Sequence, residues 1–425
     1  MLKDTAFQMA ASNIRFGRGI THELGMDLAA MEVRRTMLVI DPNLVSLPAG
    51  QTVLESLERN SIECEVFDAV AVEPTDSSFK AASEFAVSGN FDSVVAVGGG
   101  SAIDTAKAAN LYSTYPADFL DYVNAPIGKG LPVPGPLKPL IAVPTTAGTG
   151  SETTGVAIFD YVARHAKTGI AHRYLKPTLG IVDPENTASL PPAVAASSGL
   201  DVLSHALESY TAMPFNQRPM PPRPLERPAY QGSNPISDIW AITALELMAK
   251  FLPHAVADPT NTEAREQMLL AAALAGIGFG NAGVHLPHGM SYPVAGMVKD
   301  YIPPGYDVDP PMVPHGISVI LNTPAVIRFT APATPERHLR AAGALGVDIS
   351  TASIEDAGEL LANRVIHFMR LLDVPNGLSA VGYETEDIPE LVQGTLPQHR
   401  VTKLAPKAAD ESDLTSLFEA SMTIW

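Results

Sequence analysis

Cysteine is almost absent from this chain of 425 residues, which contains only Cys64. A single thiol excludes a framework of internal disulfides and indicates a compartment in which thiols stay reduced. We therefore expect Cys64 to be a buried or half-buried apolar side chain.

Positive charge and long apolar runs are also scarce. The chain has 28 Lys and Arg against 46 Asp and Glu, and its net charge of -18 argues against a nucleic-acid-binding surface. No apolar run has the length of a membrane span, and residues 1–20 show neither the apolar segment of a signal peptide nor the pattern of an Arg-rich transit peptide. We therefore expect a cytoplasmic protein. Hydrophobic residues make up 46% and charged residues 17%, which is typical of a folded protein with a sizeable core.

Two regions of different periodicity predict two domains, at residues 1–190 and 191–425. In the first, short β-rich runs alternate with helical patterns, which predicts a mostly parallel sheet covered by helices. The expected strands are 36–41, 63–67, 93–99, 140–144 and 179–183, with two more in 155–173. After Pro191 only helical patterns follow, at 191–212, 237–252, 263–280 and 354–372, so the second domain is expected to be all-helical.

The segment 93–110, SVVAVGGGSAIDTAKAAN, has the order strand, glycines, helix. Gly98, Gly99 and Gly100 would let the backbone approach a ligand closely, and Ser101 could cap the helix, whose first N–H groups favour a phosphate. The pattern is neither a GxGxxG motif nor a Walker loop, so a tight turn without a ligand remains an alternative.

A second loop, PTTAGTGSE at 144–152, also follows an expected strand. Its hydroxyl groups at Thr145, Thr146, Thr149 and Ser151 could donate to phosphate or ribose. Asp41 ends the strand at 36–41, where an acid suits a ribose 2′-hydroxyl and favours NAD over NADP. A turn residue before Pro42 explains Asp41 equally well.

Candidate metal ligands begin in GLDVLSHALESY, residues 199–210, where Asp201 and His205 lie four apart and share one helix face. His288 and His315 each occur in a later Pro-His-Gly frame. One Asp and three His suit a divalent first-row metal such as Fe²⁺ or Zn²⁺, whereas Ca²⁺ or Mg²⁺ would require more oxygen ligands. A polar surface stripe and satisfied core histidines are the alternatives.

The two loops, the Asp201–His205 pair and the two later histidines resemble the iron-containing (group III) alcohol dehydrogenase family, in the same order along nearly the whole chain. The resemblance implies a dehydroquinate-synthase-like fold with an N-terminal α/β Rossmann-like, dinucleotide-binding domain and an all-α C-terminal domain for metal and substrate. It also implies NAD and metal meeting between the domains, with the metal on Asp201, His205, His288 and His315. The implied nucleotide contacts are Asp41, Gly98, Gly99, Gly100, Ser101, Asp104, Thr145, Thr146, Thr149 and Lys167.

Within the family, residues 227–238, 285–293 and 391–406 are similar to the hydroxyacid–oxoacid transhydrogenase branch. That branch transfers hydride from 4-hydroxybutyrate, giving succinate semialdehyde, to 2-oxoglutarate, giving 2-hydroxyglutarate, through tightly held NAD. We expect Fe²⁺ as the first choice of metal and Zn²⁺ as the second. The expected partners are small hydroxy and oxo acids, without nucleic acid or membrane. The chain is expected to form a homo-oligomer. An NAD-dependent alcohol dehydrogenase that releases NADH, a dehydroquinate-synthase-like lyase and a non-catalytic nucleotide-binding protein remain alternatives.

Two further sets of residues complete the expected site. Many family members carry a histidine four residues after the third ligand, for proton relay; here that position is Tyr292, and His285 could replace it. The Pro-rich segment 213–235 supplies Arg218, Arg223 and Arg227, whose guanidinium groups suit substrate carboxylates. A solvent-exposed loop with solvated charges is the alternative.

Overall fold

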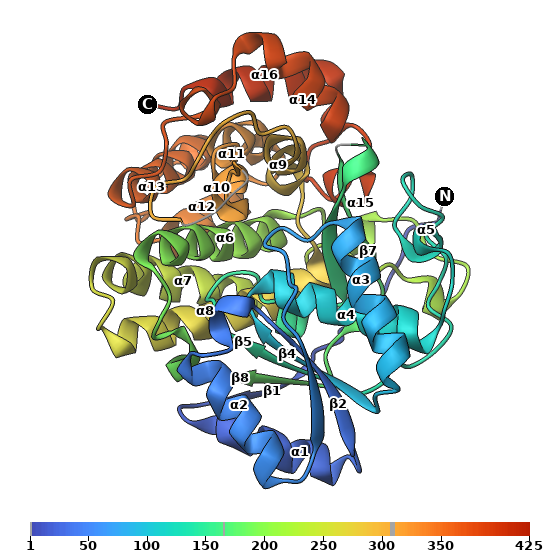
Figure 1. Cartoon of the computed structure of the whole chain (residues 1–425). Helices are drawn as coiled ribbons and strands as arrows, with labels where there is room; N and C mark the ends of the chain where they lie inside the picture. The colour runs from blue at the N-terminus through green and yellow to red at the C-terminus, as the bar shows by residue number, and fades with distance from the viewer. Residues whose placement is uncertain (1, 165, 307–310) are drawn as a thin grey trace. The chain divides into compact units, whose positions relative to one another are not determined.

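The computed structural model describes residues 2–164, 166–306 and 311–425. The chain divides into two compact units, one formed by Ala10–Leu190 and the other by Met1–Met9 together with Pro191–Trp425 (Figure 1). An α/β unit followed by a helical one confirms the predicted fold class.

The α/β unit contains a six-stranded parallel sheet with the strand order β1-β8-β5-β4-β2-β3. A separate antiparallel pair is formed by β6 and β7. The strands are β1 Asn13–Phe16, β2 Arg35–Ile40, β3 Glu63–Phe67, β4 Ser93–Gly98, β5 Leu140–Pro144, β6 Val156–Tyr161, β7 Ala166–Ala171 and β8 Leu179–Val182. The helices are α1 Leu24–Ala30, α2 Pro48–Arg59, α3 Asp76–Gly89, α4 Gly100–Thr114 and α5 Phe119–Tyr122.

Helices cover both faces of this sheet, as Figure 1 shows. Because side chains alternate along a strand, Leu38 and Ile40 of β2 pack against α1 and α2, whereas Met37 and Val39 pack against α3 and α4. Burial on both faces explains the apolar runs of the central strands β2, β4 and β5.

The strand order reverses between β2 and β4, which are neighbours although β3 separates them in sequence. In open α/β sheets, ligands bind outside the carboxyl ends of the strands at such a reversal. Asp41 follows β2 directly, and Gly98 is the last residue of β4, so both lie at this edge.

The second unit is built from helices, and its described residues contain no β-strand, only isolated bridges. Its helices are α6 Pro192–Thr211, α7 Pro235–Ala257, α8 Thr262–Ala282, α9 Leu286–Gly296, α10 His315–Ile320, α11 Thr323–Thr330, α12 Pro335–Ala344, α13 Ala357–Leu371, α14 Ile388–Thr395, α15 His399–Thr402 and α16 Glu411–Met422.

The first nine residues differ from the predicted division, which assigned residues 1–190 to one domain. They belong to the helical unit, where the buried carboxylate of Asp4 pairs with Arg218 and Arg227. Sequence periodicity could not reveal this placement, because it depends on ion pairs between residues more than 200 positions apart.

One helix of the described chain, α7, is long and apolar enough to cross a membrane by length and composition, although only 33% of its most apolar window is buried. The helices α8 and α9 meet at an angle of 104°, and they would give a second candidate span only if the pair were counted as one segment. Core helices of folded proteins pass the same test, and α7 packs along α6 and α8. The absence of a membrane partner stays a prediction.

Candidate metal and nucleotide sites

The long helix α6 carries the first two candidate metal ligands on one face. Asp201 and His205 lie one helical turn apart and are 2% and 5% exposed. The His205 ring stacks on Phe279 of α8, with 3.9 Å between the ring centroids, which fixes the orientation of the imidazole.

Two further helices bring the other histidines to the same place. His288 lies in the first turn of α9, and His315 is the first residue of α10. The Nε2 atoms of His205, His288 and His315 lie 3.6, 3.6 and 3.8 Å from Asp201 Oδ1. One ligand atom from each of the four side chains lies within 4.8 Å of all the others.

The proline and glycine of the Pro-His-Gly frames position the helices that carry the histidines. Proline stands at the N-cap of α10 and within the first turn of α9. A Cβ at Gly316 would lie 2.0 Å from the carbonyl oxygen of Ser197, so only glycine lets α10 approach α6 this closely. The repeated motif thus places each histidine in the first turn of a helix and, for α10, allows close packing.

The four side chains fit a divalent cation. Asp201 Oδ1 and His288 Nε2 are buried and have no hydrogen-bond partner among the described residues, although they face each other. Burial lowers the pKa of His205 to about 4, which keeps its imidazole neutral and able to ligate. Three imidazoles and a carboxylate form the donor set that first-row metals such as iron and zinc accept.

Glu208, which the sequence analysis did not single out, orients the third ligand. Its buried carboxylate lies 2.6 Å from His288 Nδ1 and accepts hydrogen bonds from the backbone N–H groups of His285 and His288. Although burial lowers the pKa of His288, the carboxylates of Glu208 and Asp201 raise it to about 10. The negative charge around this imidazole favours a cation on its other nitrogen.

His285 and Tyr292, the expected relay residues, lie on either side of His288 in sequence. His285 is 2% exposed, and its Nε2 lies 3.0 Å from Thr211 Oγ1. Burial lowers its pKa to about 4, so the ring is neutral. The Tyr292 hydroxyl accepts a hydrogen bond of 3.1 Å from Arg400 Nη2. A relay role for either residue stays a prediction.

In the α/β unit, the two expected nucleotide loops contact each other. A Cβ at Gly99 would lie 3.2 Å from the Thr146 side chain, and one at Gly100 would lie 2.7 Å from Thr149 Cγ2. The backbone N–H of Thr145 donates to the Gly98 carbonyl. Gly98 has a φ of +150° and lies beside Asp41, so the loops after β2, β4 and β5 form one contiguous set.

Ser101 does not cap α4, contrary to the expectation from sequence. The N-cap is Gly99, which has no side chain to cap with, and Ser101 lies inside the first turn of the helix. The N–H groups of that turn therefore have no side-chain cap, which suits an anion.

Asp104 and Lys107 join the two loops through α4. Asp104 Oδ1 accepts from Ser151 Oγ at 2.5 Å, and Asp104 Oδ2 accepts from the Ile158 N–H at 2.9 Å. Lys107, which the sequence analysis did not single out, is fully buried and donates to Ser151 Oγ and to the Val156 carbonyl. The sequence feature that could have identified Lys107 is a lysine on the buried face of the helix that follows the glycines.

The remaining two predicted nucleotide contacts already have partners in the chain. Asp41 accepts a hydrogen bond from the Asn43 N–H, as its alternative role in a turn requires. Lys167 on β7 is 2% exposed and pairs with Glu73 and Asp160, and these carboxylates raise its pKa against the lowering effect of burial. Nucleotide binding by both residues stays a prediction.

The three arginines of segment 213–235 also have acidic partners. Arg218 and Arg227 both pair with the buried Asp4, whereas Arg223 is exposed and pairs with Glu226. These ion pairs favour a structural role for Arg218 and Arg227 and a solvated surface role for Arg223. Substrate binding by any of them stays a prediction.

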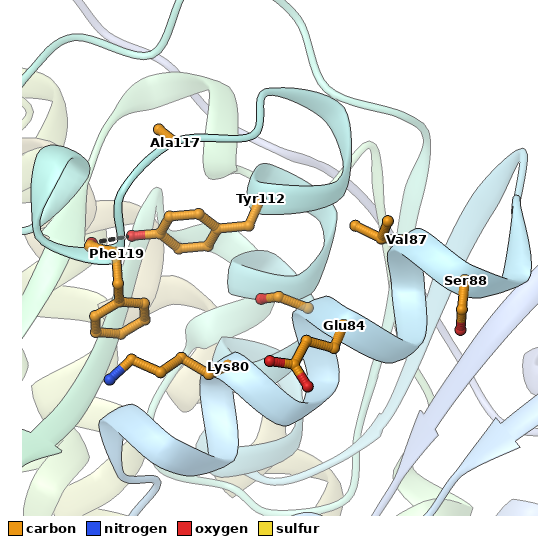
Figure 2. A pocket seen from close by; sticks show the side chains of 8 residues that line it. Lys80, Glu84, Val87, Ser88, Tyr112, Ala117 and Phe119 are labelled. Atoms are coloured by element: carbon orange, nitrogen blue, oxygen red, sulfur yellow. Dashed lines mark hydrogen bonds between the residues drawn. The ribbon is translucent and has the colours of Figure 1, made fainter.

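A surface pocket of about 340 Å³ lies over α3, α4 and α5 (Figure 2). Lys80, Tyr112 and Phe119 are among the side chains that line it, and the Tyr112 hydroxyl donates to the Phe119 carbonyl. None of its lining residues is one that the sequence analysis assigned to metal, nucleotide or substrate.

With this geometry established, comparison with known proteins identifies the family. Residues 11–184 match the model of iron-containing alcohol dehydrogenases, and residues 226–422 match the C-terminal model of the same family. The chain belongs to the iron-containing alcohol dehydrogenase family. It is an oxidoreductase acting on CH–OH groups, as predicted, and not a lyase or a non-catalytic binding protein.

The family members most like it include mitochondrial hydroxyacid-oxoacid transhydrogenases. The mouse protein is 61% identical over 424 residues, which cover 99% of this chain and 91% of the mouse chain. The human protein is 60% identical with the same coverage, and a probable hydroxyacid-oxoacid transhydrogenase from Dictyostelium discoideum is 56% identical over 99% of this chain and 80% of its own. The predicted similarity to this branch is confirmed.

Solved structures of the family share the fold. A 1,3-propanediol oxidoreductase is 26% identical, with a TM-score of 0.85 and coverage of 98% of this chain and 100% of its own. A sulfoacetaldehyde reductase from Bifidobacterium kashiwanohense, solved in complex with NAD⁺, is 27% identical, with a TM-score of 0.81 and coverage of 99% and 100%.

The prediction of a cytoplasmic location is wrong. The relatives from mouse, rat, cattle and human are all named as mitochondrial proteins. The prediction was based on residues 1–20, which show neither a signal-peptide segment nor an Arg-rich transit-peptide pattern, and on the single cysteine. The cysteine count excludes a disulfide framework but does not distinguish among compartments that keep thiols reduced.

Proposed function

We propose that this enzyme is a hydroxyacid–oxoacid transhydrogenase that uses a divalent metal and tightly held NAD. The proposed reaction converts 4-hydroxybutyrate and 2-oxoglutarate into succinate semialdehyde and 2-hydroxyglutarate. Identity of 61% to relatives of that name, over 99% of this chain, is the observation that carries the proposal.

The proposed metal ligands are Asp201, His205, His288 and His315, with Fe²⁺ as the first choice and Zn²⁺ as the alternative. Support comes from the converging ligand atoms and from the two buried orphan atoms, Asp201 Oδ1 and His288 Nε2. A divalent ion held there supplies Lewis acidity toward the hydroxyl or carbonyl oxygen of the substrate. Glu208 holds His288 in the orientation that keeps Nε2 directed at the ligand cluster.

The proposed nucleotide site is the edge formed by Asp41, residues 98–101 and residues 144–152, with Asp104 and Lys167 as further contacts. The uncapped first turn of α4 suits a diphosphate, and Asp41 suits a ribose hydroxyl. A relative of the same fold that was solved with NAD⁺ supports the choice of dinucleotide. NAD supplies the hydride carrier that both half-reactions share.

The test is to incubate dialysed enzyme with 4-hydroxybutyrate and 2-oxoglutarate, without added nucleotide, and to analyse the products by mass spectrometry. Formation of 2-hydroxyglutarate and succinate semialdehyde in equal amounts is the expected result. Formation of 2-hydroxyglutarate only after NAD⁺ or NADH is supplied would instead identify a dehydrogenase that releases its cofactor.

A further inference from the structure

Arg400 on α15 lies among aromatic side chains of the helical unit. Its Nη2 donates to the Tyr292 hydroxyl at 3.1 Å, and its Cζ atom lies 5.0 Å from the centre of the Tyr230 ring. Both contacts orient the guanidinium, but neither is an ion pair with a carboxylate, so its positive charge stays unpaired there.

This guanidinium has no counter-ion among the described residues. Arg400 Nη1 is buried and has no hydrogen-bond partner among the described residues. The side chains that influence the pKa of Arg400 are Tyr292 and Tyr230, and no carboxylate is among them. Arg218 and Arg227, by contrast, share the buried carboxylate of Asp4. Arg400 as a whole is half-buried, but a buried donor of a charged group that lacks a partner is costly unless an anion pairs with it.

Two series of contacts connect Arg400 with the candidate metal ligands. Through Tyr292 it reaches α9, where His288 lies one helical turn earlier. Through Tyr230 it reaches Phe279, whose ring centre lies 6.4 Å from that of Tyr230 and 3.9 Å from that of His205.

Helix α15 also packs directly on the turn that holds His288. A Cβ at Gly289 would lie 2.6 Å from Thr402 Cγ2, so glycine next to the ligand allows α15 to approach. Arg400 therefore lies on the helix that packs against the His288 turn, two residues before Thr402.

The substrates of the proposed reaction share one chemical feature. In 4-hydroxybutyrate, succinate semialdehyde and 2-oxoglutarate, two methylene groups separate the reacting carbon from a carboxylate. One cation at a fixed distance from the reacting oxygen can therefore bind the donor and the acceptor in turn.

We propose that Arg400 is the receptor for this shared carboxylate, with Tyr230 and Tyr292 positioning its guanidinium; the assignment rests on the proposed function. Arginine can bind a carboxylate through two parallel hydrogen bonds, and once one N–H of Nη2 has bonded Tyr292, Nη1 and the second N–H of Nη2 are the donors left for the substrate. Arg400 thus selects hydroxy and oxo acids of one chain length over neutral alcohols.

The test compares 4-hydroxybutyrate with 4-hydroxybutanamide, its neutral isostere, as hydride donors in the presence of 2-oxoglutarate. Arg400→Gln should raise KM for 4-hydroxybutyrate about 10- to 100-fold, because it removes a charged hydrogen-bonded pair. KM for the amide should change less than about threefold, and KM for 2-oxoglutarate should rise together with that for 4-hydroxybutyrate. A merely structural role would change acid and amide alike.

Chain length gives a second readout in the same variant. The wild-type enzyme should prefer 4-hydroxybutyrate to 3-hydroxypropionate and 5-hydroxypentanoate, and Arg400→Gln should lose this preference. Arg400→Lys keeps the charge but not the bidentate geometry, and it should fall between the wild type and Arg400→Gln. If Arg400→Gln does not fold, an unchanged acid preference in Arg400→Lys overturns the proposal.

Arg364→Gln is the matched control, because Arg364 on α13 also lies over an aromatic ring, that of Phe368. It should leave both KM values unchanged. Arg227→Ala tests the rival receptor: a selective rise in KM for acids there, with none in Arg400→Gln, overturns the assignment. If the wild type converts no 4-hydroxybutyrate, the proposed function itself fails; if it does and Arg400→Gln keeps its acid preference, only the assignment of Arg400 fails.

Discussion

At the scale of single residues, Glu208 shows how a buried carboxylate can serve a metal without ligating it. It contacts His288 Nδ1 and two backbone N–H groups, so it fixes both the imidazole and the start of α9. Partners of this kind set the tautomer and orientation of a ligating histidine and increase its basicity.

We therefore expect Glu208→Ala to lower metal affinity about 10- to 100-fold, because His288 loses its orienting partner. The measurement is competition for the metal with a chelator of known affinity, followed by metal analysis of the protein. Ser204→Ala is the matched control, since Ser204 lies on the same helix and, among the residues that the structure describes, bonds only the Leu200 carbonyl. Equal metal affinity in Glu208→Ala and Ser204→Ala would refute the role assigned to Glu208.

Residue identity and spacing revealed the four candidate ligands, but not what surrounds them. Asp201 and His205 share a helix face whatever the tertiary structure is, so their pairing could be predicted. The roles of Glu208 and Arg400 depend on tertiary contacts. Glu208 on α6 contacts His288 on α9, 80 residues away in sequence, and Arg400 on α15 contacts Tyr292 on α9, 108 residues away. The pairing of Arg218 and Arg227 with Asp4 was hidden for the same reason.

At the scale of elements, the β4–α4 turn and the β5 loop form the proposed nucleotide edge by touching each other. Their alternation of strand, glycine and helix could be predicted, because apolar runs and glycines are local signals. The contact of Gly100 with Thr149 could not, since it depends on β4 and β5 being neighbours in the sheet.

Gly100→Ala should weaken NADH binding at least about tenfold, because a Cβ there would lie 2.7 Å from Thr149 Cγ2 and push the two loops apart. The measurement is fluorescence titration of nucleotide-free enzyme with NADH. Gly278→Ala is the control: a Cβ at this helical position would lie 3.4 Å from its nearest neighbour, the Ser237 carbonyl oxygen, which is an ordinary van der Waals contact. Unchanged NADH affinity in Gly100→Ala would place the nucleotide elsewhere.

At the scale of the whole molecule, each unit carries one part of the proposed chemistry: the ligand cluster lies in the helical unit and the glycine loops lie in the α/β unit. A transhydrogenase differs from a dehydrogenase in one property of the whole enzyme, namely that the reduced cofactor outlasts the release of the first product. The retention of NAD is therefore the property that separates the two activities on one fold.

Isotope transfer measures that property directly. The enzyme is given 4-hydroxybutyrate deuterated at C4, 2-oxoglutarate and an excess of unlabelled free NADH. A retained cofactor should carry deuterium to C2 of 2-hydroxyglutarate almost undiluted, because the labelled nicotinamide never mixes with the free pool. A released cofactor would exchange with the pool, so that early product would be mostly unlabelled and deuterium would accumulate in free NADH. Mass spectrometry of 2-hydroxyglutarate at the first turnovers distinguishes these outcomes, and unlabelled product would contradict a transhydrogenase.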